Sequence, residues 1–501
     1  RVIIKIPAYL VCLSAITAAV YYMNPYTLIY PLISEDGFNQ TLIYKKADID
    51  SFDKGRYGFV GAVDCSETYF PITYNFNITD GWNIEGTPHN REIWNYAIAN
   101  SSGNPGYIAK NLAFDNTRFL YLGPKYDKVK DELNKKYHFN LVCVRGGYSF
   151  YSSEDSSSYF LTDKRNALVF GAGAPGVAMQ YPYLVWEYRN DISDYSLEEL
   201  EKYHVIYLCE PAVDTIEEKE KIESTVKKLI DKGITVIIEP VTTTGYTLFH
   251  VTTADIIPED FPVIQKDPES KIQSAVNRIE VEKDLLSYKV LLGLDESYYK
   301  LIQNHGRLEN DVIGAKKVGN GKVIFIGMHL SQYLKAVYTR NRGLPENEQF
   351  PSYCDDVITL FDDIFTTYGV NKNFWPDPFP VKKANWNYKG VKFEYYSPKE
   401  QEITLSITYT PRWKATLDGR PIPVGQKENL VTMNLPAGSH EVKMVYGLTK
   451  YGIAGYIISL AGLVLFFLFL KFYDIIFYWF RQISLKTGRF LQLIQEEPEI
   501  Q

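Results

Sequence analysis

The sequence predicts a membrane-anchored α/β plus β protein, in which an α+β module, a parallel α/β domain and a small β-sandwich lie between two transmembrane helices. Three observations predict this class. Residues 451–470 carry no charge, residues 161–375 alternate apolar strands with helices, and residues 376–448 alternate at period two between turns. The predicted segments are a transmembrane helix over 1–30, an extracytoplasmic α+β module over 31–160, the α/β domain over 161–375, the β-sandwich over 376–448, a transmembrane helix with its interface over 451–480 and a cytoplasmic tail over 481–501.

The composition is that of folded protein, because 46% of the 501 residues are apolar and 23% are charged. Lys plus Arg number 53 and Asp plus Glu number 60, so the net charge is 53 − 60 = −7, without a block of one sign. We therefore expect no nucleic-acid partner. The seven His and five Cys show no metal-ligand spacing, so we expect no metal site and no cofactor.

Two apolar segments predict contact with a lipid bilayer. Residues 451–470 would span about 30 Å as a helix, which is the thickness of a hydrocarbon core. Basic residues follow this run, which predicts a cytoplasmic end under the positive-inside rule: Lys471, Arg481, Lys486 and Arg489. Residues 6–23 predict a second spanning helix, although a signal peptide is the alternative. Both termini are then cytoplasmic, and residues 31–449 are extracytoplasmic.

The first part of the predicted extracytoplasmic region contains few sequence features that are specific to one fold or function. Three Asn residues precede Ser or Thr by two positions and are possible N-glycosylation sites: Asn39, Asn77 and Asn100. Strand-like pieces at 117–124 and 139–153 flank a polar helix at 125–137, and this mixture predicts the α+β module.

The central domain shows the pattern of a parallel sheet covered on both faces. The predicted strands are Ala167 to Phe170, His204 to Pro211, Ile234 to Pro240 and Lys322 to Leu330. A helix between the second and third strands has Thr215 as its predicted N-cap and Gly233 just past its end. This arrangement predicts a βαβ unit.

A glycine-rich turn follows the first of these strands. Gly171, Gly173 and Gly176 have the G-x-G-x-x-G spacing of dinucleotide-binding proteins. Pro182 interrupts the segment that should form the following helix, and the acidic residue of the second strand, Glu210, lies 34 positions beyond Gly176. We therefore expect no nucleotide here.

The carboxyl ends of parallel strands meet at one edge of a sheet, where ligands usually bind. The candidate ligand pocket at this edge comprises Gly171, Gly173, Gly176, Glu210, Glu239 and His329. Two carboxylates and an imidazole suit acid/base chemistry or sugar binding. Residues 167–188 contain no Lys or Arg, so a neutral ligand such as a glycan is favoured over a phosphate. The alternative is that Glu210-Pro211 and Glu239-Pro240 only end their strands and bind no ligand.

The third segment carries period-two alternation and the hairpin signal Asp418-Gly419. Trp413 opens one of its predicted strands and is a candidate platform for glycan stacking. The alternative, which we weight more, is that Trp413 belongs to the core of the sandwich.

Two stretches of the central domain, "EKEKIESTVKKLIDKGITVIIEP" and "GNGKVIFIGMHLSQYL", resemble the class I glutamine-amidotransferase-like fold. The resemblance implies a Cys nucleophile in the late turn, but residues 327–331 hold none. Glutaminase activity is therefore not expected. Ser331 is also not expected to replace the Cys, because no base is adjacent in the sequence.

A second resemblance lies near the C-terminus, in the sequence "YTPRWKATLDGRPIPV…VTMNLPAGSHEVKMVY" and the apolar run after it. This region resembles the C-terminal region of YfhO-like membrane proteins, also described as 6-pyruvoyl-tetrahydropterin-synthase-related. That family looks like GT-C glycosyltransferases, whose catalytic acid lies among many spanning helices. The resemblance implies the extracytoplasmic part of a protein of cell-envelope glycan assembly, for acceptor recognition or complex organisation, with no catalytic residue in this chain.

The implied partners are the lipid bilayer, a cell-surface glycan or lipid-linked sugar, and a membrane-protein complex. The alternative function is a non-catalytic cell-surface protein that is anchored by two helices and acts through protein contacts. A catalytic membrane half upstream of Arg1 would favour the first function.

Overall fold

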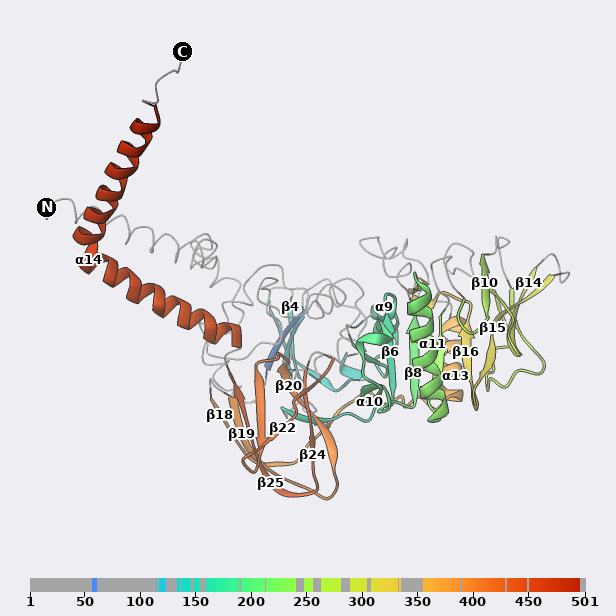
Figure 1. The fold of residues 1–501 in the computed structure, drawn as a ribbon. Helices are drawn as coiled ribbons and strands as arrows, with labels where there is room; N and C mark the ends of the chain where they lie inside the picture. Colours follow the sequence, from blue (N-terminus) through green and yellow to red (C-terminus); the bar gives the residue numbers. More distant parts are fainter. Residues whose placement is uncertain are drawn as a thin grey trace, which may run out of the picture. The chain divides into compact units, whose positions relative to one another are not determined.

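The computed structural model describes the chain over residues 56–60, 114, 117–122, 133–135, 137–145, 148–153, 159–187, 189, 191–211, 213–239, 247–255, 263–280, 289–303, 308–331, 333–334, 355–387, 390–428, 430–447 and 450–495. It forms two compact units (Figure 1). The first contains residues up to Pro380 with two later segments, Ser397–Tyr409 and Gly425–Ala437. The second contains Val381–Tyr396, Thr410–Val424 and Gly438–Gln501. The predicted helix at 1–30 and the three candidate glycosylation sites lie outside the described residues.

The first unit begins with a four-stranded sheet in the order β1-β2-β4-β3. Its strands are β1 (Arg56–Val60), β2 (Thr117–Leu122), β3 (Phe139–Arg145) and β4 (Tyr148–Ser153). The β1–β2 pair is parallel and the other pairs are antiparallel. The strand predicted near residue 117 is confirmed, and the piece at 139–153 forms a hairpin of two strands.

A nine-stranded mixed sheet forms the body of the first unit, in the order β12-β11-β14-β15-β16-β9-β8-β6-β7. The parallel strands are β6 (Ala167–Gly171), β7 (Val185–Trp186), β8 (Val205–Cys209), β9 (Thr235–Ile238) and β16 (Gly321–Ile326). All four strands predicted for this part are therefore confirmed, with shorter bounds for three of them.

The other half of this sheet is antiparallel, which the sequence did not predict. It comprises β11 (Val263–Lys266), β12 (Arg278–Glu280), β14 (Glu296–Gln303) and β15 (Leu308–Val318). A separate antiparallel pair joins β10 (Thr252–Asp255) to β13 (Lys289–Leu292). The α/β domain is thus a parallel sheet that continues as an antiparallel one.

Helices cover both faces of the parallel strands, as predicted. Along β6, Ala167 and Val169 belong to a core cluster that also includes residues of α9 (Ala174–Gln180) and α13 (Asp355–Thr367). Leu168 and Phe170 point into the opposite cluster, which includes residues of α11 (Ile216–Asp231). A strand buried on both faces needs apolar residues at every position, and β6 has them.

Local sequence signals explain where α11 begins. The Thr215 hydroxyl accepts a hydrogen bond from the Glu218 amide, and the Glu218 carboxylate accepts one from the Thr215 amide. This capping box confirms Thr215 as the predicted N-cap. The helix lies between β8 and β9, which pair in parallel, so the predicted βαβ unit is present.

A five-stranded sheet completes the first unit, in the order β17-β5-β20-β24-β23. Its strands are β5 (Phe160–Thr162), β17 (Asp377–Pro378), β20 (Gln401–Thr408), β23 (Gly425–Lys427) and β24 (Leu430–Leu435). The short strands β5 and β17 pair antiparallel at Thr162 and Asp377. The chain therefore enters and leaves the nine-stranded body through neighbouring strands.

The second unit contains a five-stranded antiparallel sheet in the order β18-β19-β25-β21-β22. Its strands are β18 (Val381–Asn387), β19 (Gly390–Ser397), β21 (Trp413–Leu417), β22 (Arg420–Ile422) and β25 (Gly438–Tyr446). Asp418 and Gly419 join β21 to β22 with φ angles of 48° and 82°, as in a type I′ hairpin. The predicted hairpin is confirmed.

The second unit ends in one long helix, α14 (Lys450–Gln495). Its segment Ile453–Phe472 has a mean hydropathy of 2.5, and none of it is buried inside the protein. Within the described residues, this is the one helix that is long and apolar enough to cross a membrane.

Candidate functional site

Four polar side chains converge where the parallel strands β8, β9 and β16 end. The Glu210 carboxylate lies 2.9 Å from His329 Nδ1 and 3.3 Å from the Ser331 hydroxyl. The Ser331 hydroxyl also lies 3.1 Å from Glu239 Oε2, and the Ser331 amide donates to Glu239 Oε1 over 3.2 Å. One hydroxyl therefore has two carboxylates within hydrogen-bonding distance. We call Glu210, Glu239, His329 and Ser331 the carboxylate cluster.

The glycine-rich turn packs directly against this cluster. A Cβ atom on Gly173 would lie 2.3 Å from the Cβ and the hydroxyl of Ser331, and one on Gly176 would lie 3.2 Å from the Ser331 carbonyl. Gly171 has a φ of 112° and approaches the Cys209 carbonyl, so a side chain there would be strained as well as blocked. The three glycines thus serve close packing between strand ends.

The helix after these glycines is short and ends before Pro182, in line with the predicted interruption at this proline. α9 begins at Ala174 and ends at Gln180, two residues before the proline, with Pro175 in its first turn. Pro is tolerated there because the first amides of a helix have no intrahelical partner. The helix is only seven residues long. A small cavity of about 90 Å³ lies beside the turn, lined in part by Gly171, Asp191 and Cys209.

Glu210 adopts an unusual backbone conformation. Its φ angle is 49°, in the left-handed region that residues with a side chain rarely adopt. The residue follows β8 directly and precedes Pro211, so the chain turns sharply at the strand end. Strained residues of this kind persist where the surroundings hold them, and here the contacts to His329 and Ser331 do so. The sharp turn projects a carboxylate across the edge of the sheet.

The two carboxylates differ in their electrostatic environment. Glu239 is fully buried, and this burial, together with the nearby charge of Glu210, raises its pKa to about 7. The side chain of Glu210 is also largely enclosed, with 10% exposed. A buried acid with a pKa near neutrality can hold a proton and donate a hydrogen bond, whereas a second acid accepts one.

Cys209 is adjacent to the cluster but is not prepared to act as a nucleophile. Its side chain is buried, and burial together with the charge of Glu239 holds the pKa of the thiol well above its usual value. The thiolate is the reactive form, and this environment disfavours it.

Of the six predicted pocket residues, the structure places four against Ser331: Gly173, Gly176, Glu210 and Glu239. His329 lies against Glu210, and Gly171 lies against the Cys209 carbonyl. The expectation that Ser331 has no neighbouring base is wrong, because Glu210 and Glu239 both lie within hydrogen-bonding distance of its hydroxyl. The sequence could not reveal this, since the two acids are 121 and 92 positions away. One feature of the sequence could have placed Ser331 in the site. Ser331 follows His329 by two residues and lies just past a predicted strand end.

Trp413 lies in the second unit, at the start of β21, and is half-buried. Its ring packs against the edge of Tyr446 with 4.9 Å between ring centroids. The Trp413 ring is thus partly enclosed, and its assignment to the core of the sandwich stays a prediction. Among the described residues, no group of three or more His, Cys, Asp or Glu side chains is arranged to hold a metal ion.

Comparison with known proteins gives one family match and several distant structural likenesses. The model of a domain of unknown function (DUF8560) matches residues 166–332, which include the whole carboxylate cluster. No curated protein matches the chain.

Three solved structures illustrate the likenesses. The α-L-fucosidase isoenzyme 2 from Paenibacillus thiaminolyticus is 10% identical with a TM-score of 0.27, over 57% of this chain and 49% of that chain. The β-galactosidase from Bacillus circulans sp. alkalophilus is 12% identical with a TM-score of 0.26, over 56% and 42%. A ThuA-like protein from Bacteroides uniformis is 12% identical with a TM-score of 0.29, over 41% and 92%. The chain spans less than half the length of the first two structures.

Proposed function

We propose that the chain is the extracytoplasmic part of a membrane-anchored protein of cell-envelope glycan assembly, and that its carboxylate cluster holds a neutral, hydroxyl-bearing ligand. The observation that carries the proposal is the convergence of Glu210, Glu239, His329 and Ser331 at the carboxyl ends of the parallel strands. Ligands bind at this edge in open α/β sheets.

The chemistry of the cluster favours a neutral ligand. Its groups are acceptors and donors of hydrogen bonds, and the glycine-rich segment 167–188 beside it contains no Lys or Arg. A phosphate or carboxylate ligand would meet two carboxylates without a compensating cation, which costs binding free energy. A sugar hydroxyl can both donate to a carboxylate and accept from a protonated acid or an imidazole.

The membrane part of the proposal rests on α14. The apolar segment Ile453–Phe472 would span the hydrocarbon core, and Lys471 near its end, with the basic residues after it, would face the cytoplasm. The strands before α14 would then be extracytoplasmic, where glycans are assembled on the cell surface. A second span near the N-terminus, with both termini cytoplasmic, belongs to the same proposal.

The proposal includes a finer description of the fold and family. We interpret the nine-stranded body as an amidotransferase-like domain without its Cys nucleophile, and we keep the β-sandwich predicted over residues 376–448 as part of this proposal. The similarity of residues 409–446 to YfhO-like, GT-C-like membrane proteins supports a role in acceptor recognition or complex organisation. No transfer chemistry is assigned to this chain.

The test is ligand binding by the full chain in lipid nanodiscs, with a matched pair of glycine substitutions. Gly173→Ala places a Cβ where Ser331 now lies, whereas the Cβ of Gly447→Ala would make only ordinary contacts, the nearest at 3.7 Å. Binding of neutral oligosaccharides is measured by calorimetric titration. We expect affinity to fall about tenfold or more for Gly173→Ala and to be unchanged for Gly447→Ala. Displacing Ser331 from the two carboxylates should cost roughly 1.4 kcal/mol of binding free energy, which corresponds to a factor of ten.

Two results would overturn the proposal. One is micromolar binding of NAD, ATP or a nucleotide sugar that Gly173→Ala abolishes, because the site would then be a nucleotide site. The other is the absence of glycan binding by the full chain together with specific capture of one protein partner, which would favour the non-catalytic protein-contact function.

A further inference from the structure

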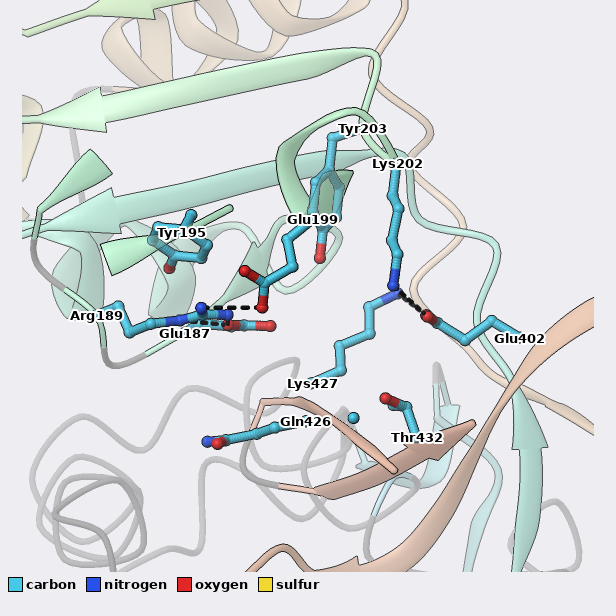
Figure 2. Close-up of a pocket in the computed structure, with 11 residues that line it drawn as sticks. Glu187, Arg189, Tyr195, Glu199, Lys202, Tyr203, Glu402, Gln426, Lys427 and Thr432 are labelled. Carbon is cyan, nitrogen blue, oxygen red and sulfur yellow. Dashed lines mark hydrogen bonds and ion pairs between the residues drawn. The ribbon is translucent and has the colours of Figure 1, made fainter. Parts of the chain in front are cut away.

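A second cavity lies in the first unit, away from the carboxylate cluster, with a volume of about 110 Å³ (Figure 2). One wall comes from the segment after β7, from the end of the 3-10 helix η4 (Ile192–Asp194) and from the short helix α10 (Leu197–Leu200) with the residues after it. The other wall comes from β20, β23 and β24 of the five-stranded sheet. We call this space the inter-sheet pocket.

On one side of the inter-sheet pocket two acids share one base. Arg189 donates to Glu187 Oε2 over 2.5 Å and to Glu199 Oε1 over 3.0 Å. Its guanidinium also lies over the ring of Tyr195, 3.8 Å from the centroid. Burial raises the pKa of Glu187, and the charge of Arg189 offsets only part of this effect. The Glu187 carboxylate is therefore incompletely compensated.

On the other side two bases share one acid. Lys202 Nζ lies 2.8 Å from Glu402 Oε2, and Lys427 Nζ lies 3.9 Å from Glu402 Oε1. Lys427 also pairs with Asp163 over 3.1 Å. Figure 2 shows the Arg189 group and the Lys202 group facing the same space from different elements. Every cation of the pocket thus has a carboxylate partner, and no strong net charge is left for a charged ligand.

One buried hydroxyl that lines the pocket, that of Tyr195, has no hydrogen-bond partner within the part of the chain that the structure describes. Both bonds from Arg189 to Glu187 go to Oε2, so Oε1 receives no bond from this arginine. Tyr203 and Thr432 line the same cavity, and their side chains are more than 90% buried. Buried polar groups normally have partners, so the Tyr195 hydroxyl beside the Glu187 carboxylate points to a ligand.

We propose that the inter-sheet pocket binds a neutral polyhydroxyl molecule, of the size of one sugar unit. Glu187 Oε1 needs a donor, and a hydroxyl suits it better than an ammonium group because Arg189 and Lys427 line the same space. An anion would meet Glu187, Glu199 and Glu402. A sugar hydroxyl donates to the carboxylate while neighbouring hydroxyls bond Tyr195, Tyr203 and Thr432. This site is separate from the carboxylate cluster and goes beyond the proposed function.

The test uses two substitutions that each remove one hydroxyl from the pocket lining, Tyr195→Phe and Thr432→Val, in the full chain in lipid nanodiscs. The Tyr195 hydroxyl has no protein hydrogen bond to lose among the described residues, so the melting temperature of Tyr195→Phe should stay unchanged. The control is Tyr396→Phe, at an exposed position on β19. The probes are glucose, galactose, mannose and N-acetylglucosamine, with glucuronate as an anion and glycine betaine as a zwitterion, measured by saturation-transfer NMR and calorimetry.

We expect at least one neutral sugar to bind and each pocket substitution to weaken it about fivefold, which is the effect of one hydrogen bond. Tyr396→Phe should leave this binding unchanged, and the pocket substitutions should weaken sugar binding also in a chain that carries Gly173→Ala, which separates the inter-sheet pocket from the carboxylate cluster. The proposal is overturned if no neutral sugar binds, if only glucuronate or glycine betaine binds, or if the two pocket substitutions leave sugar affinity unaltered.

Discussion

Arg165 and Glu428 lie 263 positions apart and form a two-bond ion pair in the protein interior. Nη2 of Arg165 lies 2.6 Å from Glu428 Oε2, and Nη1 lies 3.3 Å from Oε1. Their side chains are 0% and 1% exposed. Arg165 also binds Asp163, and Glu428 accepts the Trp186 amide. The pair connects the start of the nine-stranded body to the β23–β24 turn of the five-stranded sheet.

The first prediction concerns this pair. Glu428→Gln leaves the buried guanidinium with one carboxylate partner instead of two, and breaking a buried pair typically costs about 3–5 kcal/mol of unfolding free energy. Glu441→Gln is the matched control, because Glu441 pairs with Lys392 at a half-exposed position where an ion pair contributes less than about 1 kcal/mol. Urea denaturation of both variants is the measurement, and equal midpoints would contradict the prediction.

The second prediction concerns Glu239 and pH. Its pKa is about 7 in the folded protein and 4.5 as the ordinary value, so the folded state binds the proton more tightly. Stability is highest below pH 4.5, where both states are protonated, and falls as the pH rises to about 7. The total loss is on the order of 3 kcal/mol. Glu239→Gln should remove this slope. The measurement is the unfolding free energy of both proteins between pH 4 and 8. If Glu239→Gln showed the same dependence of unfolding free energy on pH as the native chain, Glu239 would not be the group that titrates.

The third prediction concerns the membrane helix. Leu463→Arg places a charge near the centre of Ile453–Phe472 and should disfavour insertion by about 3 kcal/mol. Leu485→Arg is the control, because it lies in the same helix beyond the apolar segment. Insertion is measured by carbonate extraction and by glycosylation mapping in microsomes. A soluble native chain, or equal insertion of both variants, would contradict a spanning helix.

The fourth prediction concerns Trp413. Because its ring is half-buried against Tyr446, we expect Trp413→Ala to cost about 1–3 kcal/mol, less than the 3–5 kcal/mol typical of a fully buried ring. Trp413→Phe should restore most of this stability. If Trp413 is instead a stacking platform for glycans, the Ala variant melts like the native chain and loses glycan binding.

Local signals explain what could be predicted from the sequence. The capping residues Thr215 and Glu218 and the apolar runs of β6, β8 and β9 are decided by neighbours in the chain. The proximity of Glu210, Glu239 and His329 could be predicted because parallel strands bring their carboxyl ends to one edge, so position along the strand predicts proximity.

Long-range pairings explain what could not be predicted. β5 has only three residues, and its partners are β17 and β20, more than 200 positions away. The inter-sheet pocket likewise joins residues 187–203 to residues 402–432. The antiparallel strand β14 has buried and half-buried residues, and β15 has four consecutive buried residues, but these patterns do not show which sheet the strands extend. Such contacts depend on packing rather than on local preference.

The pairing of β5 with β17 makes the nine-stranded body an insertion in a β-sheet protein. Paired residues on antiparallel strands lie about 5 Å apart, so a short turn from Thr162 to Asp377 would close the sheet without residues 163–376. The family match at 166–332 falls wholly inside this inserted segment. The buried pair of Arg165 with Glu428 fastens the insertion to its host sheet, so we expect the body and the sheet to unfold together as one cooperative unit.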